Sequence, residues 1–454
     1  MAPAAIPAAP RRDATRLLAV ALTVLALVLR VAFLTGAEMP DPVRGDIREY
    51  WFYAWNLVEH GVFSLAPPAD VAPAPDAWRS PGYPAFLALC LWLAGAPEPA
   101  VALAQWLQVL VGTALVPLTI VLGRRWLAPG WALAAGAAVA VWPHLVVFAS
   151  TLLSETLFAF ALLVAAWLVA RAQVADDARF AGGAGACAGL ATLVNPLLLL
   201  FPPVVAAVLG VRGQRRVALA YLLGFAVVTG AWAARDATVD AGPGPRQRIH
   251  TNLVQGSWPL FLQALNDRSF HPNAEAYVQH VVAQTRAMDA DPRATLAAIG
   301  ARFRADPGPY ARWYLLEKPW LLWSWGVRSG WGDVYFLETR RSPFDRYPVL
   351  RALRAACLAL NPVVAALALW GTLLAMTRLV RRWRPADPAA VAPDFAWQHA
   401  ALFLAYATAV HVVLQGEPRQ AIAYRPFEFL VAASALAWTF AAVARWRARR
   451  ERPA

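Results

Sequence analysis

Long apolar runs separated by short polar connections dominate the chain. A membrane-spanning helix needs roughly 20 predominantly apolar residues. Two shorter runs, 181–194 and 197–211, flank Asn195-Pro196, and we interpret them as a pair of short spans because proline interrupts regular helix. With this pair, the pattern predicts an all-α polytopic membrane protein of about ten transmembrane helices. The longer runs lie at 17–35, 101–122, 131–152, 153–170, 216–234, 355–379, 397–414 and 427–444.

The composition agrees with this fold class. The chain has 454 residues, of which 59% are hydrophobic, against roughly 45–50% in soluble domains. The first apolar run, 17–33, is too long for a signal-peptide core and is not followed by a small-residue cleavage site, so we expect a retained anchor. The apolar segment 82–95 is short, and we expect a surface or re-entrant helix there.

Charge and cysteine content exclude several classes. The net charge of +13 could indicate nucleic-acid binding, but most arginines cluster at the ends of apolar runs, where the positive-inside bias and anionic lipids explain them. We therefore expect a membrane-lipid environment and no nucleic-acid partner. Cys90, Cys187 and Cys357 lie within apolar stretches without paired spacing or nearby histidines, which predicts neither a disulfide framework nor a zinc site.

The arginine groups also predict the orientation. With ten spans and a cytoplasmic start, both termini and all the arginine groups between spans fall on the cytoplasmic side. We expect an N-terminal transmembrane core at 1–235 that includes a catalytic first outer loop at 36–100, an extracytoplasmic loop region at 236–347, and C-terminal transmembrane helices at 348–454. The groups are Arg11/Arg12, Arg124/Arg125, Arg171/Arg179, Arg212/Arg215/Arg216, Arg381/Arg382/Arg384 and the arginines of 445–452.

Both outer regions contain amphipathic patterns. Residues 274–290 and 293–304 are predicted to form amphipathic helices. In the first outer loop, Asp46 and Glu49 precede a dense aromatic cluster, Tyr50, Trp51, Phe52, Tyr53 and Trp55. If 47–60 is helical, Trp51, Trp55 and Val58 share one face, which we expect in the lipid headgroup region with the acids on the other side.

Short motifs then follow in a fixed order: Asp46, Tyr50, Ala54, Gly61-Val62-Phe63-Ser64 and Arg79-Ser80-Pro81-Gly82-Tyr83-Pro84. This order resembles the first outer loop of the polyprenyl-phosphate-sugar glycosyltransferases of the GT-C fold, which include protein O-mannosyltransferases and aminoarabinose transferases. Similar motifs at 231–236, 416–419 and 424–426 extend the resemblance over most of the chain. The resemblance implies a substrate site that includes Tyr50 and Tyr83.

Two acids are candidate catalytic residues. Asp46 is our candidate base for an acceptor hydroxyl, because a phosphate leaving group needs no general acid; the alternative role is an N-cap of helix 47–60. Glu155 lies at the outer start of a span, where the resemblance implies an acid and where it could instead only favour the helix dipole. If the two converge they could hold a divalent cation, but relatives differ in their need for metal, so no cofactor is assigned.

Four arginines are candidates for the donor phosphate. Arginine binds phosphate oxygens in a bidentate manner. These four are predicted at the outer ends of spans, although positive charges usually lie on the cytoplasmic side. The alternative for each is an interaction with lipid headgroups. The four are Arg79, Arg235, Arg419 and Arg425.

The expected function is therefore an inverting glycosyltransferase in the cytoplasmic membrane with an extracytoplasmic active site. Its donor would be a polyprenyl-phosphate sugar and its acceptor a cell-envelope glycan, a lipid or a protein. A transporter or flippase of lipid-linked glycans would also place ionisable groups at a cavity, but the chain shows no duplicated halves and its acids lie on one face. A non-catalytic relative would keep the fold without needing Asp46.

Overall fold

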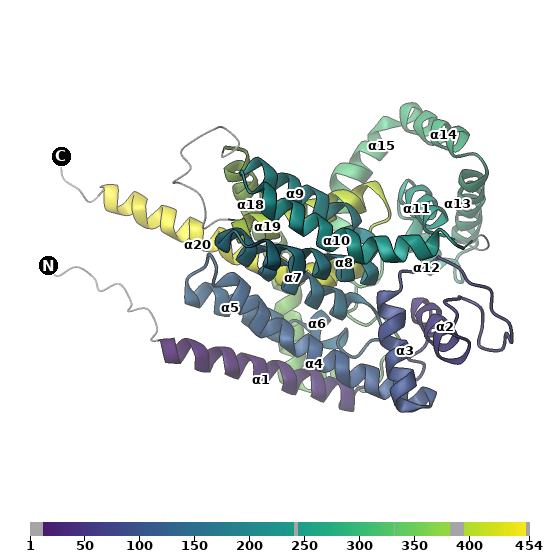
Figure 1. Ribbon diagram of the computed structural model, residues 1–454, viewed down its shortest axis with the longest axis horizontal. Coiled ribbons are helices and arrows are strands. Elements are labelled where there is room, and N and C mark those ends of the chain that lie inside the picture. Colours follow the sequence, from purple (N-terminus) through teal and green to yellow (C-terminus); the bar gives the residue numbers. More distant parts are fainter. Residues whose placement is uncertain (1–11, 240–243, 331, 382–394, 451–454) are drawn as a thin grey trace.

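The computed structural model describes residues 12–239, 244–330, 332–381 and 395–450 (Figure 1). The regular elements of this part are helices. Six helices are long and apolar enough to cross a membrane, which confirms an all-α, multi-pass membrane protein. They are α1 (Arg12–Gly36), α4 (Pro97–Gly123), α7 (Glu155–Ala175), α10 (Arg215–Asp236), α18 (Pro348–Arg381) and α20 (Arg425–Arg450).

Shorter apolar helices fill the space between these six. Because several are shorter than a full span, the predicted count of ten transmembrane helices is not confirmed. The segment 82–95, for which we expected a surface or re-entrant helix, forms a separate short helix. The set consists of α3 (Gly82–Ala94), α5 (Pro129–Val141), α8 (Ala178–Val194), η1 (Pro196–Leu200) with α9 (Phe201–Val211), and the longer, largely buried α19 (Phe395–Val413).

Glycines allow the tightest helix contact, between α8 and α10. A Cβ atom on Gly185 would lie 1.9 Å from the carbonyl oxygen of Tyr221, and one on Gly224 would lie 2.1 Å from that of Gly182. Since real Cβ atoms do not approach so closely, only glycine lets the two backbones meet. Small residues have this role in membrane helix pairs generally.

One predicted span is broken. We expected 131–152 to be a single helix, but α5 ends before Trp142 and a new short helix, α6 (Pro143–Val147), follows it. Proline cannot donate a backbone hydrogen bond and keeps the preceding residue extended, and Trp142 has φ −65° and ψ 120°. Regular helix resumes only at Glu155, so the break places this acid in the first turn of α7.

Arg30, in the last third of the first apolar run, binds the carbonyl groups at this break. Its guanidinium donates to the carbonyl oxygens of Val139 at 3.1 Å, Ala140 at 3.2 Å and Ala26 at 3.1 Å. The last carbonyls of a helix lack intrahelical partners, and a cation there is stabilising. The side chain is fully buried. The sequence analysis gave Arg30 no role.

A second group of helices carries its own small core. The two predicted amphipathic helices are confirmed as α13 (Pro272–Ala290) and α14 (Pro292–Ala305). They pack with α11 (Pro245–Gly256) and α12 (Phe261–Asp267) around Val254, Phe261, Val278, Val281, Met288 and Ile299. The chain then returns through α15 (Pro307–Arg312), η2 (Trp313–Glu317), α16 (Lys318–Leu322) and α17 (Pro343–Arg346).

The helix expected at 47–60 is α2 (Asp46–Glu59), but its orientation differs from our prediction. Trp51 is 7% exposed and packs in the protein core, while Trp55 and Val58 are half-buried. The prediction of a headgroup-facing aromatic face is therefore wrong. Its periodicity identified an apolar face correctly, but protein rather than lipid covers Trp51.

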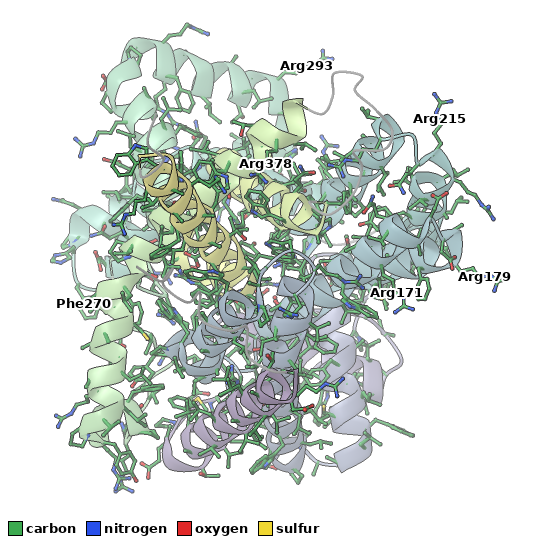
Figure 2. The ribbon with its side chains drawn as sticks, turned by 90° about the vertical axis from the view of Figure 1, so that its left-hand side faces the viewer. Arg171, Arg179, Arg215, Phe270, Arg293 and Arg378 are labelled. Atoms are coloured by element: carbon green, nitrogen blue, oxygen red, sulfur yellow. The ribbon has the colours of Figure 1, made fainter. Side chains whose placement is uncertain are left out.

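The start of α1 and the end of α20 lie at one end of the bundle, and α2, α12 and α13 lie at the opposite end, which we call the distal end (Figure 1). Figure 2 looks onto the first of these ends and labels Arg171, Arg179 and Arg215, from the connections among α7, α8 and α10. The three side chains are exposed. These three arginines, from groups that the sequence assigned to one side, thus lie at the end opposite the distal end.

Candidate active site

The predicted acids and two of the four predicted arginines meet at the distal end. Four chain segments supply them: the start of α2, the loop before α3, the start of α7, and the 3-10 helix η4 (Pro418–Tyr424). Gly45, with φ 61°, turns the chain into α2 and places Asp46 in its first turn. Only glycine adopts such a φ without strain, so this turn depends on Gly45.

Asp46 lies between two arginines. One carboxylate oxygen accepts from Arg419 Nη2 at 2.8 Å, and the other accepts from Arg79 Nη2 at 3.2 Å. Arg79 also donates through Nε to Glu49 at 2.6 Å. The two arginine side chains are 13% and 11% exposed. The carboxylate does not cap α2, because the helix has no side-chain cap and both oxygens are bound to arginines.

Arg419 joins this pair to two further acids. Its Nε lies 3.6 Å from Glu155 Oε1 and 3.7 Å from Glu417 Oε2. Its guanidinium stacks over Phe336, with 4.6 Å from the central carbon to the ring centroid. Arg419 is therefore the central cation of the cluster.

Three buried polar atoms in the cluster make no hydrogen bond within the described part of the chain, and one of them, Nε of Arg419, still lies within ion-pair distance of Glu155 and Glu417. Among the described residues, Nη1 of Arg419 and Oε2 of Glu155 make no hydrogen bond. Buried donors and acceptors in proteins are normally paired, and leaving one unmade costs about 1–3 kcal/mol. One unpaired group is a cationic donor and the other is a carboxylate acceptor, so the site offers complementary contacts to a ligand.

The surroundings of Asp46 make it a weak base. Burial would raise the pKa of its carboxyl, but the charges of Arg419 and Arg79 outweigh burial and hold the pKa well below its usual range. A carboxylate stabilised in its charged form takes up a proton reluctantly. The environment of Asp46 is therefore better suited to holding two arginines than to accepting a proton.

Arg248, on α11, is a neighbour that the sequence analysis missed. Its Nη1 makes a 3.5 Å contact with the carbonyl oxygen of Trp78. Burial lowers the pKa of Arg248, and the nearby charge of Arg79 lowers it further. Two arginines close together in a partly buried place attract an anion. The sequence gave little indication of this role, because Arg248 lies within the polar region 236–347 and not at the end of an apolar span, where the other candidate arginines were found.

A small cavity adjoins these arginines. Its polar lining brings together parts of α2, the loop before α3, the turn before α7 and the α8–η1 break, with Arg248 on one side. The Asn195-Pro196 break contributes to this wall because the extended Asn195 interrupts the helix there. The lining residues are Tyr50, Ser80, Ser154, Val194, Asn195, Pro196 and Arg248.

The two predicted substrate tyrosines have different positions. Tyr50 lines the cavity, and the Arg79 guanidinium lies over its ring at 5.0 Å. Tyr83 is completely buried, packs edge-on against Tyr50 and donates its hydroxyl hydrogen to Gln108 at 2.7 Å. Tyr50 can therefore touch a ligand in the cavity, whereas Tyr83 supports Tyr50 from behind.

Arg235 and Arg425 do not join the cluster. Arg235 donates to the backbone carbonyls of Asp76 at 2.6 Å and Phe63 at 3.3 Å, and so holds the first loop against α10. Arg425 is 1% exposed and binds Glu428, one turn along α20, at 2.7 Å. Both side chains thus bind protein groups, although Nε of Arg425 makes no hydrogen bond with the described residues.

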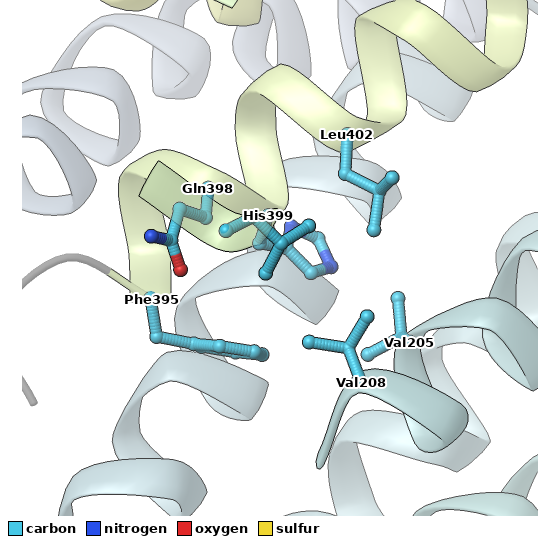
Figure 3. Close-up of a pocket in the computed structure, with 7 residues that line it drawn as sticks. Val205, Val208, Phe395, Gln398, His399 and Leu402 are labelled. Atoms are coloured by element: carbon cyan, nitrogen blue, oxygen red, sulfur yellow. The ribbon is translucent and has the colours of Figure 1, made fainter. Parts of the chain in front are cut away.

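A second cavity lies elsewhere in the bundle and has a different character (Figure 3). It lies between α9 and the first turns of α19, whereas Arg419 follows the last turn of that helix. Its lining, which is mainly aliphatic and aromatic, includes no acid and no arginine. The lining residues are Val205, Val208, Leu379, Phe395, Gln398, His399 and Leu402.

Comparisons with known proteins show similarity at the level of structure. A scan against protein-family models finds no match, and a search of curated proteins finds no significant one. Among solved structures, the chain is similar to the archaeal oligosaccharyltransferase AglB from Archaeoglobus fulgidus in complex with an inhibitory peptide and a dolichol-phosphate. Identity is 16%, the alignment covers 96% of this chain and 51% of that chain, and the TM-score is 0.50.

A structure of the Archaeoglobus fulgidus oligosaccharyltransferase in complex with Zn and sulfate aligns with 14% identity, coverage of 94% and 49%, and a TM-score of 0.50. The chain thus spans about half the length of both proteins. ArnT from Cupriavidus metallidurans bound to undecaprenyl phosphate aligns with 16% identity, coverage of 89% and 78%, and a TM-score of 0.38, which is too low to support an argument. The similarity to AglB confirms the predicted GT-C-like fold.

Proposed function

We propose that this protein is an inverting glycosyltransferase that moves a sugar from a polyprenyl-phosphate-sugar donor to an acceptor hydroxyl. The observation that carries this proposal is the pair of unpaired buried atoms, Arg419 Nη1 and Glu155 Oε2, in one cluster. Transfer from a lipid phosphate needs a cation for the departing phosphate and a base for the acceptor hydroxyl. The fold shared with AglB, which was solved with a dolichol-phosphate, supports the same class of donor.

Arginines stabilise the departing phosphate in this proposal. Arg419 offers Nη1, and Arg79 and Arg248 flank the cavity that Tyr50 lines. Charge-assisted hydrogen bonds to phosphate oxygens are the strong kind, and a low-dielectric site increases their effect. The phosphate leaves as a stable anion, so no general acid is required. Arg235 and Arg425, which bind protein groups, are assigned to the fold rather than to the donor.

Glu155 is the better-placed base. One of its oxygens is free of protein partners, and its contact with Arg419 is 3.6 Å, beyond a direct hydrogen bond. Asp46 orients Arg79 and Arg419 and is thus a positioning residue. During transfer, Glu155 takes the proton of the acceptor hydroxyl, the acceptor oxygen bonds to the anomeric carbon, and the bond from that carbon to the phosphate oxygen breaks.

We assign the distal end to the outer face of the cytoplasmic membrane. Arg171, Arg179 and Arg215, from connections between spans, lie at the opposite end, and the positive-inside bias places such arginines in the cytoplasm. Reporter fusions after Arg125 and within residues 260–290 test this orientation. Reporters on the same side of the membrane would contradict it.

The test of function is in vitro transfer from short-chain polyprenyl-phosphate sugars by purified protein. Glu155→Gln keeps size and should lower transfer by roughly 10²–10⁴-fold, the usual contribution of a general base, with little change in Tm. Asp46→Asn should reduce both transfer and Tm, because it releases two arginines. Glu59→Gln, at the exposed end of α2, is the matched control and should behave like the wild type. Near-normal transfer by Glu155→Gln would refute the base assignment.

A further inference from the structure

The acids of the site surround a side chain and do not converge on a common empty point. Asp46, Glu155 and Glu417 each approach a nitrogen of Arg419, at 2.8, 3.6 and 3.7 Å. Among the residues that the structure describes, no group of three or more His, Cys, Asp or Glu side chains could hold a metal ion. The guanidinium thus lies where oxygen ligands would have to meet around a cation.

The charge balance also differs from that of a divalent cation site. Such sites hold Mg²⁺, Mn²⁺ or Ca²⁺ with several carboxylate or carbonyl oxygens and an excess of negative charge. Here Asp46 and Glu49 share Arg79, and Asp46, Glu155 and Glu417 share Arg419, so much of the negative charge is already offset. Arg248 adds a further positive charge next to Arg79. A divalent ion would enter a place already occupied by positive charge, and repulsion would oppose it.

Phe336 and η4 hold Arg419 in place. The guanidinium lies over the ring of Phe336, and the Glu417 backbone N–H donates to the Gln420 side chain at 2.9 Å, which fixes the start of η4. Moving Arg419 aside would break its 2.8 Å bond to Asp46 and leave three acids without their cation. The residues therefore do not fit a resident divalent cation of the kind named for the oligosaccharyltransferase crystallised with Zn.

We infer that Arg419 fills the cation position among Asp46, Glu155 and Glu417, and that the protein works without a bound divalent metal. The guanidinium then has two roles. It fixes the two acids relative to each other, as a metal would, and it presents Nη1 to an incoming anion. An arginine cannot activate a water molecule as a metal does, which agrees with a reaction whose nucleophile is an acceptor hydroxyl.

The direct test is Mn²⁺ binding by the purified full chain, measured by electron paramagnetic resonance without any donor or acceptor. Wild type and Arg419→Lys should show no stoichiometric site. Arg419→Ala removes the positive charge from three carboxylates and should tighten Mn²⁺ binding by at least about tenfold. Arg419→Ala combined with Glu155→Gln should lose this gain, and Arg235→Ala, which removes an arginine outside the cluster, should match wild type.

Two outcomes would overturn the inference. One is a stoichiometric Mn²⁺ site in the wild type that Asp46→Asn abolishes, a measurement that needs no Arg419 variant to fold. The other is a folded Arg419→Ala that binds no more Mn²⁺ than the wild type, because the acids would then form no cation position. Neither measurement requires transfer activity, so the inference can hold even if the proposed donor is wrong. If transfer is observed, it should persist in EDTA.

Discussion

Lys318 offers the sharpest prediction about stability. It is the only lysine in the chain and it is 2% exposed. Its ammonium donates to the carbonyl oxygens of Gly256 at 2.9 Å, Val412 at 2.6 Å and Leu414 at 2.5 Å. It thus fastens α11 to the end of α19, just before the segment that carries Arg419. An ammonium has three donors around one atom, whereas the arginine fork is planar.

The expected cost follows from these three bonds. Gly256 O also accepts from Trp313 Nε1 at 3.1 Å and would keep that bond. In Lys318→Met, the carbonyls that lose their ammonium donor without this replacement are those of Val412 and Leu414. Charge-assisted bonds contribute about 1.5–3 kcal/mol each. Because both share one ammonium, their effects are less than additive, and we expect a loss of about 3 kcal/mol in unfolding free energy. Lys318→Arg should cost at least as much, since the planar group cannot reproduce the geometry.

Thermal and denaturant unfolding in detergent would measure this loss. Arg312→Met is the matched control, because Arg312 lies on the preceding helix and its side chain is 73% exposed; exposed ion pairs contribute at most about 1 kcal/mol. Transfer by Lys318→Met should also fall below that of the control, because the α19 end positions Arg419. A Lys318→Met or Lys318→Arg protein as stable as the control would refute the reasoning.

Three further predictions follow from buried or paired charges. Arg30→Met should lower the Tm, because the carbonyls of Val139 and Ala140 lose their donor at about 1–3 kcal/mol each; an unchanged Tm would contradict the capping role. Arg235→Ala should free the first loop, seen as faster proteolysis between α2 and α3, without a change in the KM for the donor. A higher donor KM with unchanged proteolysis would instead support a role for Arg235 in binding the donor phosphate. The pKa of Asp46 is depressed, so its stabilisation is present above its ordinary pKa of about 4 and lost as pH falls further. The Tm difference between wild type and Asp46→Asn should be constant above about pH 5 and shrink below about pH 4, and a difference independent of pH would argue against the ion pairs.

The sequence predicted which end of the molecule carries the site, but not how its arginines are used. Arg419 and Arg425 gave the same signal, an arginine at the end of a span, yet only Arg419 reaches the acids. Glu428 lies three residues after Arg425, a spacing at which opposite charges pair on a helix. This spacing could have shown that Arg425 serves the fold and not the site. The interaction of Arg235 with loop carbonyls has no comparable local pattern, because its partners are separated from it by 159 and 172 residues.

Helical periodicity had a similar limit at α2. The spacing of Trp51 and Trp55 identified a helix and an apolar face, and both exist. Lipid and protein interior are equally apolar, so the pattern does not tell which one covers the face. Pro143 was visible in the sequence, yet the whole run 131–152 that contains it was long enough for a span. Proline within a membrane helix is often tolerated when neighbours satisfy the freed carbonyls, and here Arg30 supplies that donor.

The bond between Arg30 and the end of α5 has a consequence for biogenesis. Its partners lie 109 and 110 residues later in the chain. At roughly 5–20 residues per second, the ribosome needs roughly 5–20 s to make that stretch. During this time Arg30, near the distal end of α1, has no partner on α5, and an unpaired arginine in a membrane helix costs up to about 2.5–3.5 kcal/mol, the value at the helix centre. The guanidinium on the first helix to emerge therefore gains its carbonyl partners on α5 only after α4 and most of α5 have been made.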